Sequence, residues 1–287
     1  MDSSIITQVF LPLALAIIMM GMGLTLVPDD FKRVLLYPKA IALGIVFHVV
    51  LLPLIAWLVI HLLGLRPELA VGLMILASCP AGPTSNLITH LSKGDTALAI
   101  TLTVFSSMVT IFTIPFVVNY SIRHFMPAGG AEMLPLFRTI LTVLFIIAVP
   151  VAIGMFLKMK FPVFAERSQK PFKILSALFL VLIIISALYN EKDNLAEFFR
   201  LAGPAALLLN GLTLGISFLL ARLIRLNFRQ SLTISIESGI QNGTLGIAIA
   251  TTLLQNAAMS IPSAIYSIIM FLTAALIIYI GNRTIRS

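Results

Sequence analysis

The stretch Ile236-Glu237-Ser238-Gly239-Ile240-Gln241-Asn242-Gly243 lies inside a long apolar region of the chain. Glu237 is the one acidic residue that cannot be placed at the end of an apolar segment. An ionised carboxylate at the centre of a bilayer costs at least about 2.5–3.5 kcal/mol. The glycines that follow it also weaken a helix, each by roughly 1 kcal/mol relative to alanine. This stretch therefore predicts an ion site in an unwound helix, because it combines an acid, two amides and two helix-weakening residues at membrane depth.

The composition places the chain among membrane proteins. Of its 287 residues, 59% are hydrophobic and 10% are charged, whereas soluble domains carry about 25% charged residues. Apolar segments recur from one end to the other and the mean hydropathy is +1.07, which excludes a soluble domain with one anchor. The net charge of +8 comes from basic residues clustered between apolar segments. This pattern indicates anchoring at the surface of a lipid bilayer rather than binding of nucleic acid.

Signatures of catalysis are absent from the sequence. It contains no His-Glu-x-x-His zinc pair, no Gly-x-Ser-x-Gly elbow and no Gly-x-x-x-x-Gly-Lys phosphate loop. We therefore expect neither an enzyme nor an organic cofactor, and an ATP-driven pump within this chain is excluded.

The lengths of the apolar segments predict an all-α polytopic membrane protein. A membrane-spanning helix needs about 20 mostly apolar residues, and by that rule residues 1–287 form a single transmembrane domain with nine spans. The expected spans are Ile6–Leu26, Lys39–Leu63, Leu69–Leu91, Ala97–Asn119, Pro135–Met159, Phe172–Leu188, Ala202–Ile224, Leu232–Leu254 and Ile261–Ile280. The third and the eighth are interrupted, at Cys79–Pro83 and at Ser238–Gly243.

The basic residues predict the orientation in the membrane. With nine spans, fourteen of the 19 Lys and Arg residues fall in loops on one side. The five on the other side are Arg66, Arg123, Arg138, Lys192 and Arg200. Because cytoplasmic loops carry the excess of basic residues, we expect a cytoplasmic C-terminus and an external N-terminus. Asp29–Leu36 is expected to form a short amphipathic helix in the cytoplasmic interface.

The two interrupted spans are similar enough to suggest an inverted repeat. Each break follows about a dozen mostly apolar residues, and the preceding span carries a lone polar residue, His48 in one case and Asn210 in the other. The matching spans are offset by five, an odd number, so the two units have opposite orientations. Inverted repeats with two crossed, discontinuous helices are the plan of many secondary transporters.

Oxygen-bearing side chains gather at both breaks. Unwound backbone inside a membrane is tolerated only where it faces protein or water, and hard cations prefer oxygen ligands that include a carboxylate. Near the first break these residues are Thr84, Ser85, Asn86, Thr101 and Thr103. At the second they are Glu237, Gln241, Asn242 and the carbonyls from Ser238 to Ile240. If the breaks cross, both sets face one volume.

Together, four motifs resemble those of the bile acid:sodium symporter family. They are Met20-Gly21-Met22-Gly23-Leu24-Thr25-Leu26, Cys79-Pro80-Ala81-Gly82-Pro83-Thr84-Ser85-Asn86, Lys93-Gly94-Asp95 and Glu237-Ser238-Gly239-Ile240-Gln241-Asn242. The resemblance covers nearly the whole chain in the right order and spacing. It implies a core domain of helices at about 39–119 and 202–283 and a panel domain at about 6–26 and 135–188. It also implies two sodium ions that couple uptake of an organic anion, in a bacterial cytoplasmic (inner) membrane. We expect no obligate protein partner.

The resemblance also implies roles for particular residues. One sodium site would use Ser85, Asn86, Thr103 and Glu237. The other would use Glu237, Gln241 and the carbonyls of Ser238 and Ile240, with His48 in the position of a supporting glutamine. The substrate cavity would be lined by Asn242, Thr84 and Pro83.

The chain departs from the family pattern at four places. Ala99 stands where many members have a serine one turn before Thr103, so the first site lacks one oxygen ligand or includes a water. His48 offers nitrogen, which is a poor sodium ligand, or a hydrogen bond to Gln241. Pro83 replaces a threonine, and Met270-Phe271 replaces a His-Asn pair of the cavity wall.

We therefore expect a sodium-coupled symporter of a small organic anion, such as a bile acid or another carboxylate, that works by alternating access. A proton-coupled or sodium-independent carrier is the alternative that His48 and Ala99 favour. A non-transporting receptor or a channel of the same fold is a further alternative. A purely structural role is a separate alternative for these side chains: Ser85, Asn86 and Thr103 as interhelical hydrogen-bonding residues of the kind membrane proteins use, and His48 as a histidine bonded to a backbone carbonyl.

Overall fold

The computed structural model describes residues 10–127, 133–191 and 193–284. Helices make up nearly all of these residues, and the pairing of strands within them is limited to an isolated antiparallel bridge between Ala81 and Gln241. The all-α prediction is thus confirmed. The start of the first expected span at Ile6 lies outside the described residues, as do Lys192 and Arg286, which entered the orientation argument.

The helical elements follow the expected order of apolar segments. In the first half they are α2 (Leu11–Gly23), α3 (Pro28–Lys32), η2 (Arg33–Leu35), α4 (Pro38–Val46), η3 (Phe47–Leu51), α5 (Leu52–Leu63), α6 (Pro67–Ser78), α7 (Thr84–Leu91) and α8 (Thr96–Phe125). In the second half they are α9 (Leu136–Lys160), α10 (Pro162–Asn190), α11 (Leu195–Leu223), α12 (Phe228–Gly239), α13 (Gly243–Ala248), η4 (Ile249–Leu253), η5 (Ala258–Ser260) and α14 (Ile261–Thr284).

The described helices include several that fit a bilayer. Six are long and apolar enough to cross a membrane, and α2 together with α3 and η2 makes a seventh candidate. The chain bends by 79° between α2 and the α3–η2 segment. This segment is the expected amphipathic stretch, and its first turns hold ion pairs between Asp29 and Lys32 and between Asp30 and Arg33.

Proline and glycine account for several helix boundaries. Pro38, Pro67 and Pro162 stand at helix starts, where the missing N–H is not needed. Gly64 ends α5 in the left-handed region, with φ of 60°. A proline inside a helix removes one main-chain donor, and the π-type turn η3 lies directly before Pro53.

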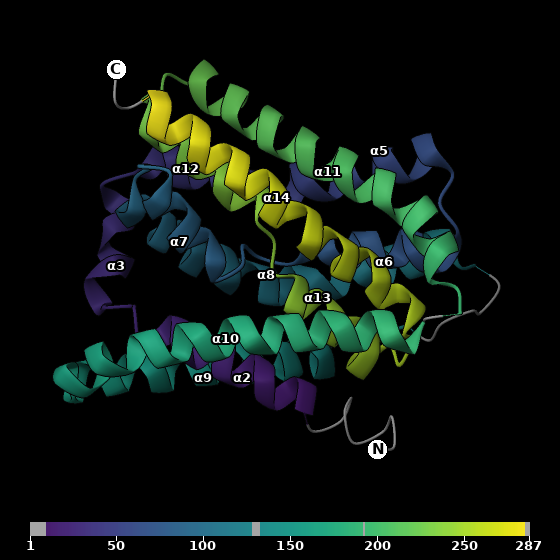
Figure 1. Ribbon diagram of the computed structural model, residues 1–287, viewed down its shortest axis with the longest axis horizontal. Helices are drawn as coiled ribbons and strands as arrows, with labels where there is room; N and C mark the ends of the chain where they lie inside the picture. The colour runs from purple at the N-terminus through teal and green to yellow at the C-terminus, as the bar shows by residue number, and fades with distance from the viewer. Residues whose placement is uncertain (1–9, 128–132, 192, 285–287) are drawn as a thin grey trace.

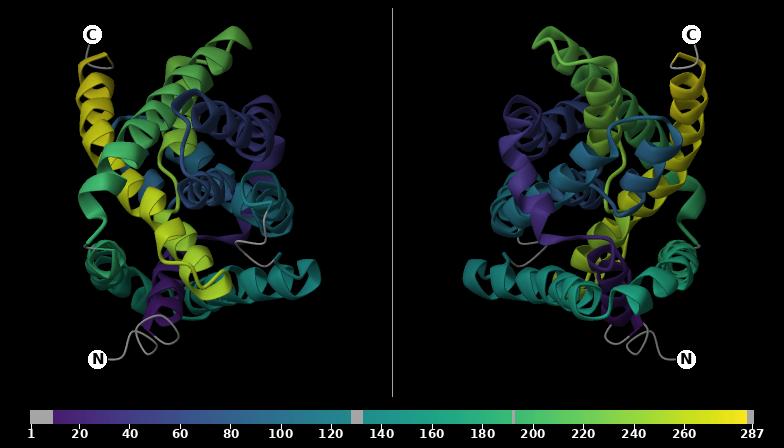
Figure 2. Two further views of the ribbon diagram at one scale, coloured as in Figure 1. Left: turned by 90° about the vertical axis from the view of Figure 1, so that its right-hand side faces the viewer. Right: turned by 90° about the vertical axis from the view of Figure 1, so that its left-hand side faces the viewer.

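Three helices form a group at one side of the molecule. In Figure 1, α2, α9 and α10 run along the bottom, and Figure 2 shows the same group below the other helices. The approach of α2 to α9 is close, because a Cβ atom on Gly23 would overlap the main-chain carbonyl of Val151. Glycine at this position therefore permits the contact.

The remaining helices form the second group. Here α6 packs against α5 and α8, and α11 packs against α12 and α14. A cluster of buried apolar side chains also joins the two groups, through Leu15 on α2, Ile75 on α6, Ile183 on α10 and Leu245 on α13. We call these four residues the apolar seal.

Candidate functional site

The two chain breaks cross and are joined through their main chains. The N–H of Gly82 donates to the carbonyl of Ile240 at 2.9 Å, and the N–H of Asn242 donates to the carbonyl of Pro80 at 3.0 Å. These reciprocal bonds flank the antiparallel bridge between Ala81 and Gln241. Backbone N–H and C=O groups that leave a helix inside a membrane need other hydrogen-bond partners. Here each break supplies those partners to the other.

The glycine after the second break is required by packing. A Cβ atom on Gly243 would overlap the hydroxyl of Ser267 on α14. The second broken helix therefore lies directly against α14 at the crossing. The sequence indicated only that this glycine weakens a helix.

Glu237 lies on α12, two residues before the helix ends, and is fully buried. Its Oε2 accepts a hydrogen bond of 2.7 Å from the hydroxyl of Thr103 on α8. The Ser85 side chain at the start of α7 lies beside the same carboxyl. The structure thus brings together three of the four residues expected at the first sodium site, from three different helices.

Five buried oxygen atoms on residues at or next to the two breaks lack a hydrogen-bond partner of good geometry. They are Glu237 Oε1, Ser85 Oγ, Asn86 Oδ1, Ser238 Oγ and Gln241 Oε1. In native proteins roughly 90% or more of buried polar groups are paired. Five unpaired acceptor oxygens, one of them on a carboxylate, form a donor set that suits a hard cation.

The main-chain carbonyls of the second break retain some capacity to bind. The Ser238 carbonyl accepts a bond of 2.7 Å from Nε2 of Gln241, and the Ile240 carbonyl accepts the N–H of Gly82. A carbonyl oxygen has two lone pairs, so each of these oxygens keeps one for a further partner. The bond to Ser238 also directs the Gln241 Oε1 atom away from that carbonyl.

His48 is buried in the π-type turn η3. Its Nδ1 lies 3.0 Å from the carbonyl of Gly44, and its ring lies against the backbone of Glu237. Its Nε2 has no hydrogen-bond partner. No hydrogen bond joins His48 to Gln241, whose Nε2 donates to the Ser238 carbonyl.

The carbonyl of Gly239 is held by two side chains that sequence reasoning did not assign. Asn210 Nδ2 donates to it at 2.9 Å, and the Tyr266 hydroxyl donates to it at 2.9 Å. Asn210 was visible in the sequence as a lone polar residue within an apolar span. Tyr266 gave no such signal, because a tyrosine in the last helix is equally typical of a membrane interface.

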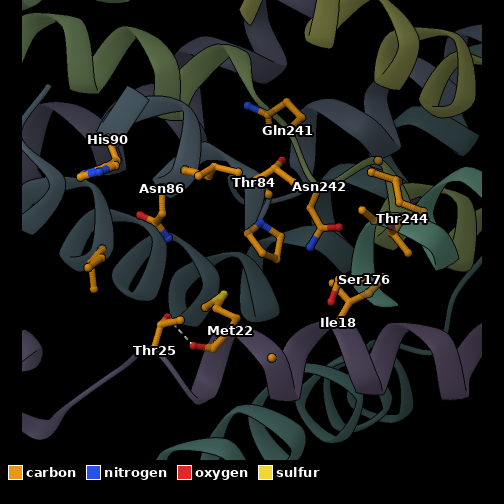
Figure 3. Close-up of a pocket in the computed structure, with 18 of the residues that line it drawn as sticks. Ile18, Met22, Thr25, Thr84, Asn86, His90, Ser176, Gln241, Asn242 and Thr244 are labelled. Atoms are coloured by element: carbon orange, nitrogen blue, oxygen red, sulfur yellow. Dashed lines mark hydrogen bonds between the residues drawn. The ribbon is translucent and has the colours of Figure 1, made fainter. Parts of the chain in front are cut away.

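A cavity of about 430 Å³ lies between the two groups of helices, next to the crossing. Figure 3 shows Asn86, Thr84 and Asn242 on one side of it, with Ile18, Met22 and Ser176 on the other. The expected substrate residues Asn242, Thr84 and Pro83 all line it. Asn242 also caps α13, because its Oδ1 accepts a bond of 3.0 Å from the N–H of Leu245.

The rest of the lining is mostly uncharged. The polar lining residues that the sequence did not single out are Thr25, His90, Thr96, Gln169, Ser176 and Thr244. Met270 lines the cavity, whereas Phe271 is 39% exposed and lies outside the lining. Within the described residues, no Lys, Arg, Asp or Glu side chain contributes to the wall. An anion in this cavity would be held by neutral donors.

Crossed, broken helices with a buried carboxylate at their crossing and an adjoining cavity define a polytopic membrane protein of the transporter class. The profile of the sodium bile acid symporter family matches residues 12–198, which is more than half of the chain. The chain therefore belongs to the sodium bile acid symporter family, as its motifs predicted.

Similar proteins come from bacteria, plants and animals. An uncharacterized sodium-dependent transporter of Bacillus subtilis (strain 168), YocS, is 29% identical over 90% of this chain and 78% of its own length. The probable sodium/metabolite cotransporter BASS1, chloroplastic, of Arabidopsis thaliana is 27% identical over 94% and 66%. The ileal sodium/bile acid cotransporter of Homo sapiens is 28% identical over 84% and 69%. The chain thus spans about two thirds to three quarters of these relatives' lengths.

Proposed function

We propose that this protein is a sodium-coupled symporter that carries a small organic anion across the membrane by alternating access. The observation that carries the proposal is the set of five unpaired buried oxygens at the two crossed breaks, among them one on the Glu237 carboxyl, next to a cavity that Asn86 and Gln241 line. A cation gives such oxygens the partner that they lack. Membership of a family of sodium symporters supports sodium as that cation.

Two sodium positions share the carboxylate of Glu237. The first uses Ser85, Asn86, Thr103 and Glu237, and the second uses Glu237, Gln241 and the carbonyls of Ser238 and Ile240. The 2.7 Å contact between Thr103 and Glu237 and the unpaired oxygens support these sets. A positive ion next to Glu237 also offsets the large penalty of burying a carboxylate.

The substrate is a small organic anion held beside the crossing. A volume of about 430 Å³ lies within the usual range for small-molecule sites, about 300–1,000 Å³. Pro83 and Thr84 stand at the N-terminus of α7, an eight-residue helix whose dipole favours negative charge there. Asn242 and Thr84 supply neutral donors for a carboxylate or sulfonate, whether on a bile acid or a smaller metabolite.

The two groups of helices could move against each other as rigid bodies. In the proposed arrangement α2, α9 and α10 form the panel, the other helices form the core, and each broken pair counts as one span. The six long helices, α2 and the two broken pairs then give nine spans. With the basic loops assigned to the cytoplasm, nine spans predict an external N-terminus and a cytoplasmic C-terminus.

The cavity favours an inward-facing state. Its lining runs from the crossing to Thr25, His90 and Thr96, near the basic loops that we assign to the cytoplasm. On the other side of the crossing, the apolar seal of Leu15, Ile75, Ile183 and Leu245 closes the route between panel and core. Rocking of the core against the panel would open the apolar seal and close the present cavity, so that the site faces the other side of the membrane.

Sodium and substrate are coupled through the crossing. Sodium bound by Glu237 and Gln241 orders the second break, which carries Asn242 at the start of α13. The ordered break then presents Asn242 and the N-terminus of α7 to the anion. Each sodium ion that moves inward across 100 mV contributes about 2.3 kcal/mol to accumulation.

Uptake by proteoliposomes tests the proposal. A panel of radiolabelled carboxylates and sulfonates is offered with an inward sodium gradient and with an equal potassium gradient. We expect saturable uptake that requires sodium. Uptake that is equal in both gradients contradicts sodium coupling, and flux that never saturates indicates a channel.

A proton-coupled carrier is the second candidate, and the unpaired Nε2 of buried His48 beside Glu237 is the observation that favours it. This alternative predicts uptake that follows a pH gradient in the absence of sodium and is lost in His48→Gln. Sodium coupling predicts that His48→Gln retains sodium-driven uptake.

A further inference from the structure

A pair of histidines lies far from the crossing, at the ends of two helices. His61 belongs to the last turn of α5 and His124 to the last turn of α8. Both side chains are exposed. Their Nε2 atoms are 3.4 Å apart, although 63 positions separate them in the chain. None of the proposed sodium or substrate steps uses these residues.

The separation of the two nitrogen atoms fits a shared metal ion. Without a metal ion, this distance is that of a long N–H···N hydrogen bond between the two rings. Zinc binds histidine nitrogen at about 2.0–2.1 Å with tetrahedral angles, which puts two ligand nitrogens about 3.4 Å apart. The two Nε2 atoms therefore already stand at the distance that a chelated zinc ion demands.

A hydrogen bond at Nδ1 of His61 leaves the lone pair of its Nε2 available to a metal ion. Its Nδ1 lies 2.8 Å from the carbonyl of Trp57, and a carbonyl can only accept, so Nδ1 carries the proton. The lone pair is then on Nε2, which faces His124. Metal-binding histidines commonly donate their second nitrogen to a main-chain carbonyl in this way.

Aromatic neighbours hold both imidazole rings in place. The ring centroids of Trp57 and His61 are 3.9 Å apart. Tyr120 stacks on His124 with centroids 5.7 Å apart and planes 8° apart, and Phe125 meets the edge of His124 at 4.7 Å. Rings that are already fixed lose little freedom when a ligand binds.

We propose that His61 and His124 form a binding site for a divalent transition-metal ion of the zinc type, which links the ends of α5 and α8. Two imidazole nitrogens supply the protein ligands, and water completes the coordination on the exposed side. The bound ion ties α8, which carries Thr103, to α5 and thereby stabilises this part of the helix bundle. The site is separate from the sodium positions in residues, ligand chemistry and location.

Zinc titration of the purified full chain tests this site. The protein carries an affinity tag without histidine, and binding is followed by calorimetry and by thermal unfolding. We expect saturable binding of one zinc ion and a rise in unfolding temperature. His61→Gln and His124→Gln should each weaken binding by at least about tenfold, since each removes one of two ligands. The double variant, which keeps neither ligand, should lose saturable zinc binding.

His90→Gln is the matched control, because His90 is also exposed but has no histidine neighbour. It should bind zinc as the wild type does. The sodium-dependent rise in unfolding temperature verifies that each variant is folded. Absence of saturable zinc binding in the wild type overturns the proposal. So does zinc binding that is unchanged in both single variants, or lost equally in His90→Gln.

Discussion

The hydroxyl of Thr103 on α8 lies 2.7 Å from Oε2 of Glu237 on α12. One turn earlier on the same face of α8 is Ala99, a fully buried residue that brings no side-chain oxygen. Residues four apart on a helix are neighbours, so position 99 adjoins the proposed first sodium site. A single oxygen atom added at position 99 should therefore change the sodium affinity of that proposed site.

The substitution Ala99→Ser should tighten sodium binding. It adds one hydroxyl oxygen next to Thr103 and Glu237, and a gain of about 1.4 kcal/mol would lower the half-saturating sodium concentration about tenfold. Sodium-dependent uptake and thermal shift both report this concentration. Ala97→Ser, on the same helix, is the matched control and should change little. Unaltered sodium dependence in Ala99→Ser would argue against a sodium ion at this position.

Replacement of Glu237 by glutamine should remove the response to sodium. The variant keeps the shape of the side chain but loses the negative charge that both proposed ions share. A ligand at 100 times its dissociation constant stabilises a protein by about 2.7 kcal/mol, so the wild type should unfold at a higher temperature in sodium than in potassium. Glu166→Gln, which alters an exposed carboxylate, should retain this difference. A full sodium shift in Glu237→Gln would exclude the proposed site.

Asn242→Asp should test the contact of residue 242 with the substrate. Aspartate can still accept the hydrogen bond from Leu245 that caps α13, but a carboxylate at this buried position costs at least about 2.5–3.5 kcal/mol when ionised, so the unfolding temperature should fall. Its added negative charge faces the cavity and should repel an anion. We expect KM for the transported anion to rise at least about tenfold while the sodium-dependent thermal shift persists. Transport at the wild-type KM would show that Asn242 does not contact the substrate.

Tyr266→Phe should weaken the fold without removing the sodium response. The change deletes the hydroxyl that donates to the Gly239 carbonyl, while Asn210 still donates to the same oxygen. The loss of one buried hydrogen bond costs about 0.5–1.5 kcal/mol, which should lower the unfolding temperature by a few degrees. The unfolding temperature should fall by the same amount in sodium and in potassium, so that the difference between the two salts is unchanged.

Access of water to the cavity can be probed with cysteine. Leu87 lines the cavity and is 47% exposed, so Leu87→Cys should react with a charged thiol reagent applied from the proposed cytoplasmic side. Leu54 is 56% exposed but lies on an expected lipid-facing surface, so Leu54→Cys should not react. The native Cys79 is buried and provides the background rate. Labelling of Leu87→Cys from the other side alone would contradict the inward-facing assignment.

The sequence was sufficient for the fold class and for the location of the site. Glu237 and the two breaks stood out because a charge and helix-weakening residues within an apolar span are costly in a membrane, and such costs are visible along one chain. The same reasoning marked Ser85, Asn86 and Thr103 as sources of oxygen, and the structure places Ser85 and Thr103 at the carboxyl of Glu237.

Features that depend on which helix faces meet were not predictable. Tyr266 and Asn210 converge on the Gly239 carbonyl from two helices, and Ser176 reaches the cavity from α10. Tyr266 and Ser176 do not differ in sequence from ordinary packing residues, and the lone polar Asn210 gave no sign of its partner. The sequence left two roles open for His48, a hydrogen bond to Gln241 and a structural role, and in the structure its Nδ1 lies at the carbonyl of Gly44.

The joint between the two breaks has a consequence for how such a protein can change over time. Gly82 with Ile240 and Asn242 with Pro80 are connected by main-chain atoms alone. Substitutions at cavity positions such as Met270 or Ser176 leave that connection intact. Point changes in the wall can therefore reshape the cavity, while the main-chain connection between the two breaks is inherited unaltered.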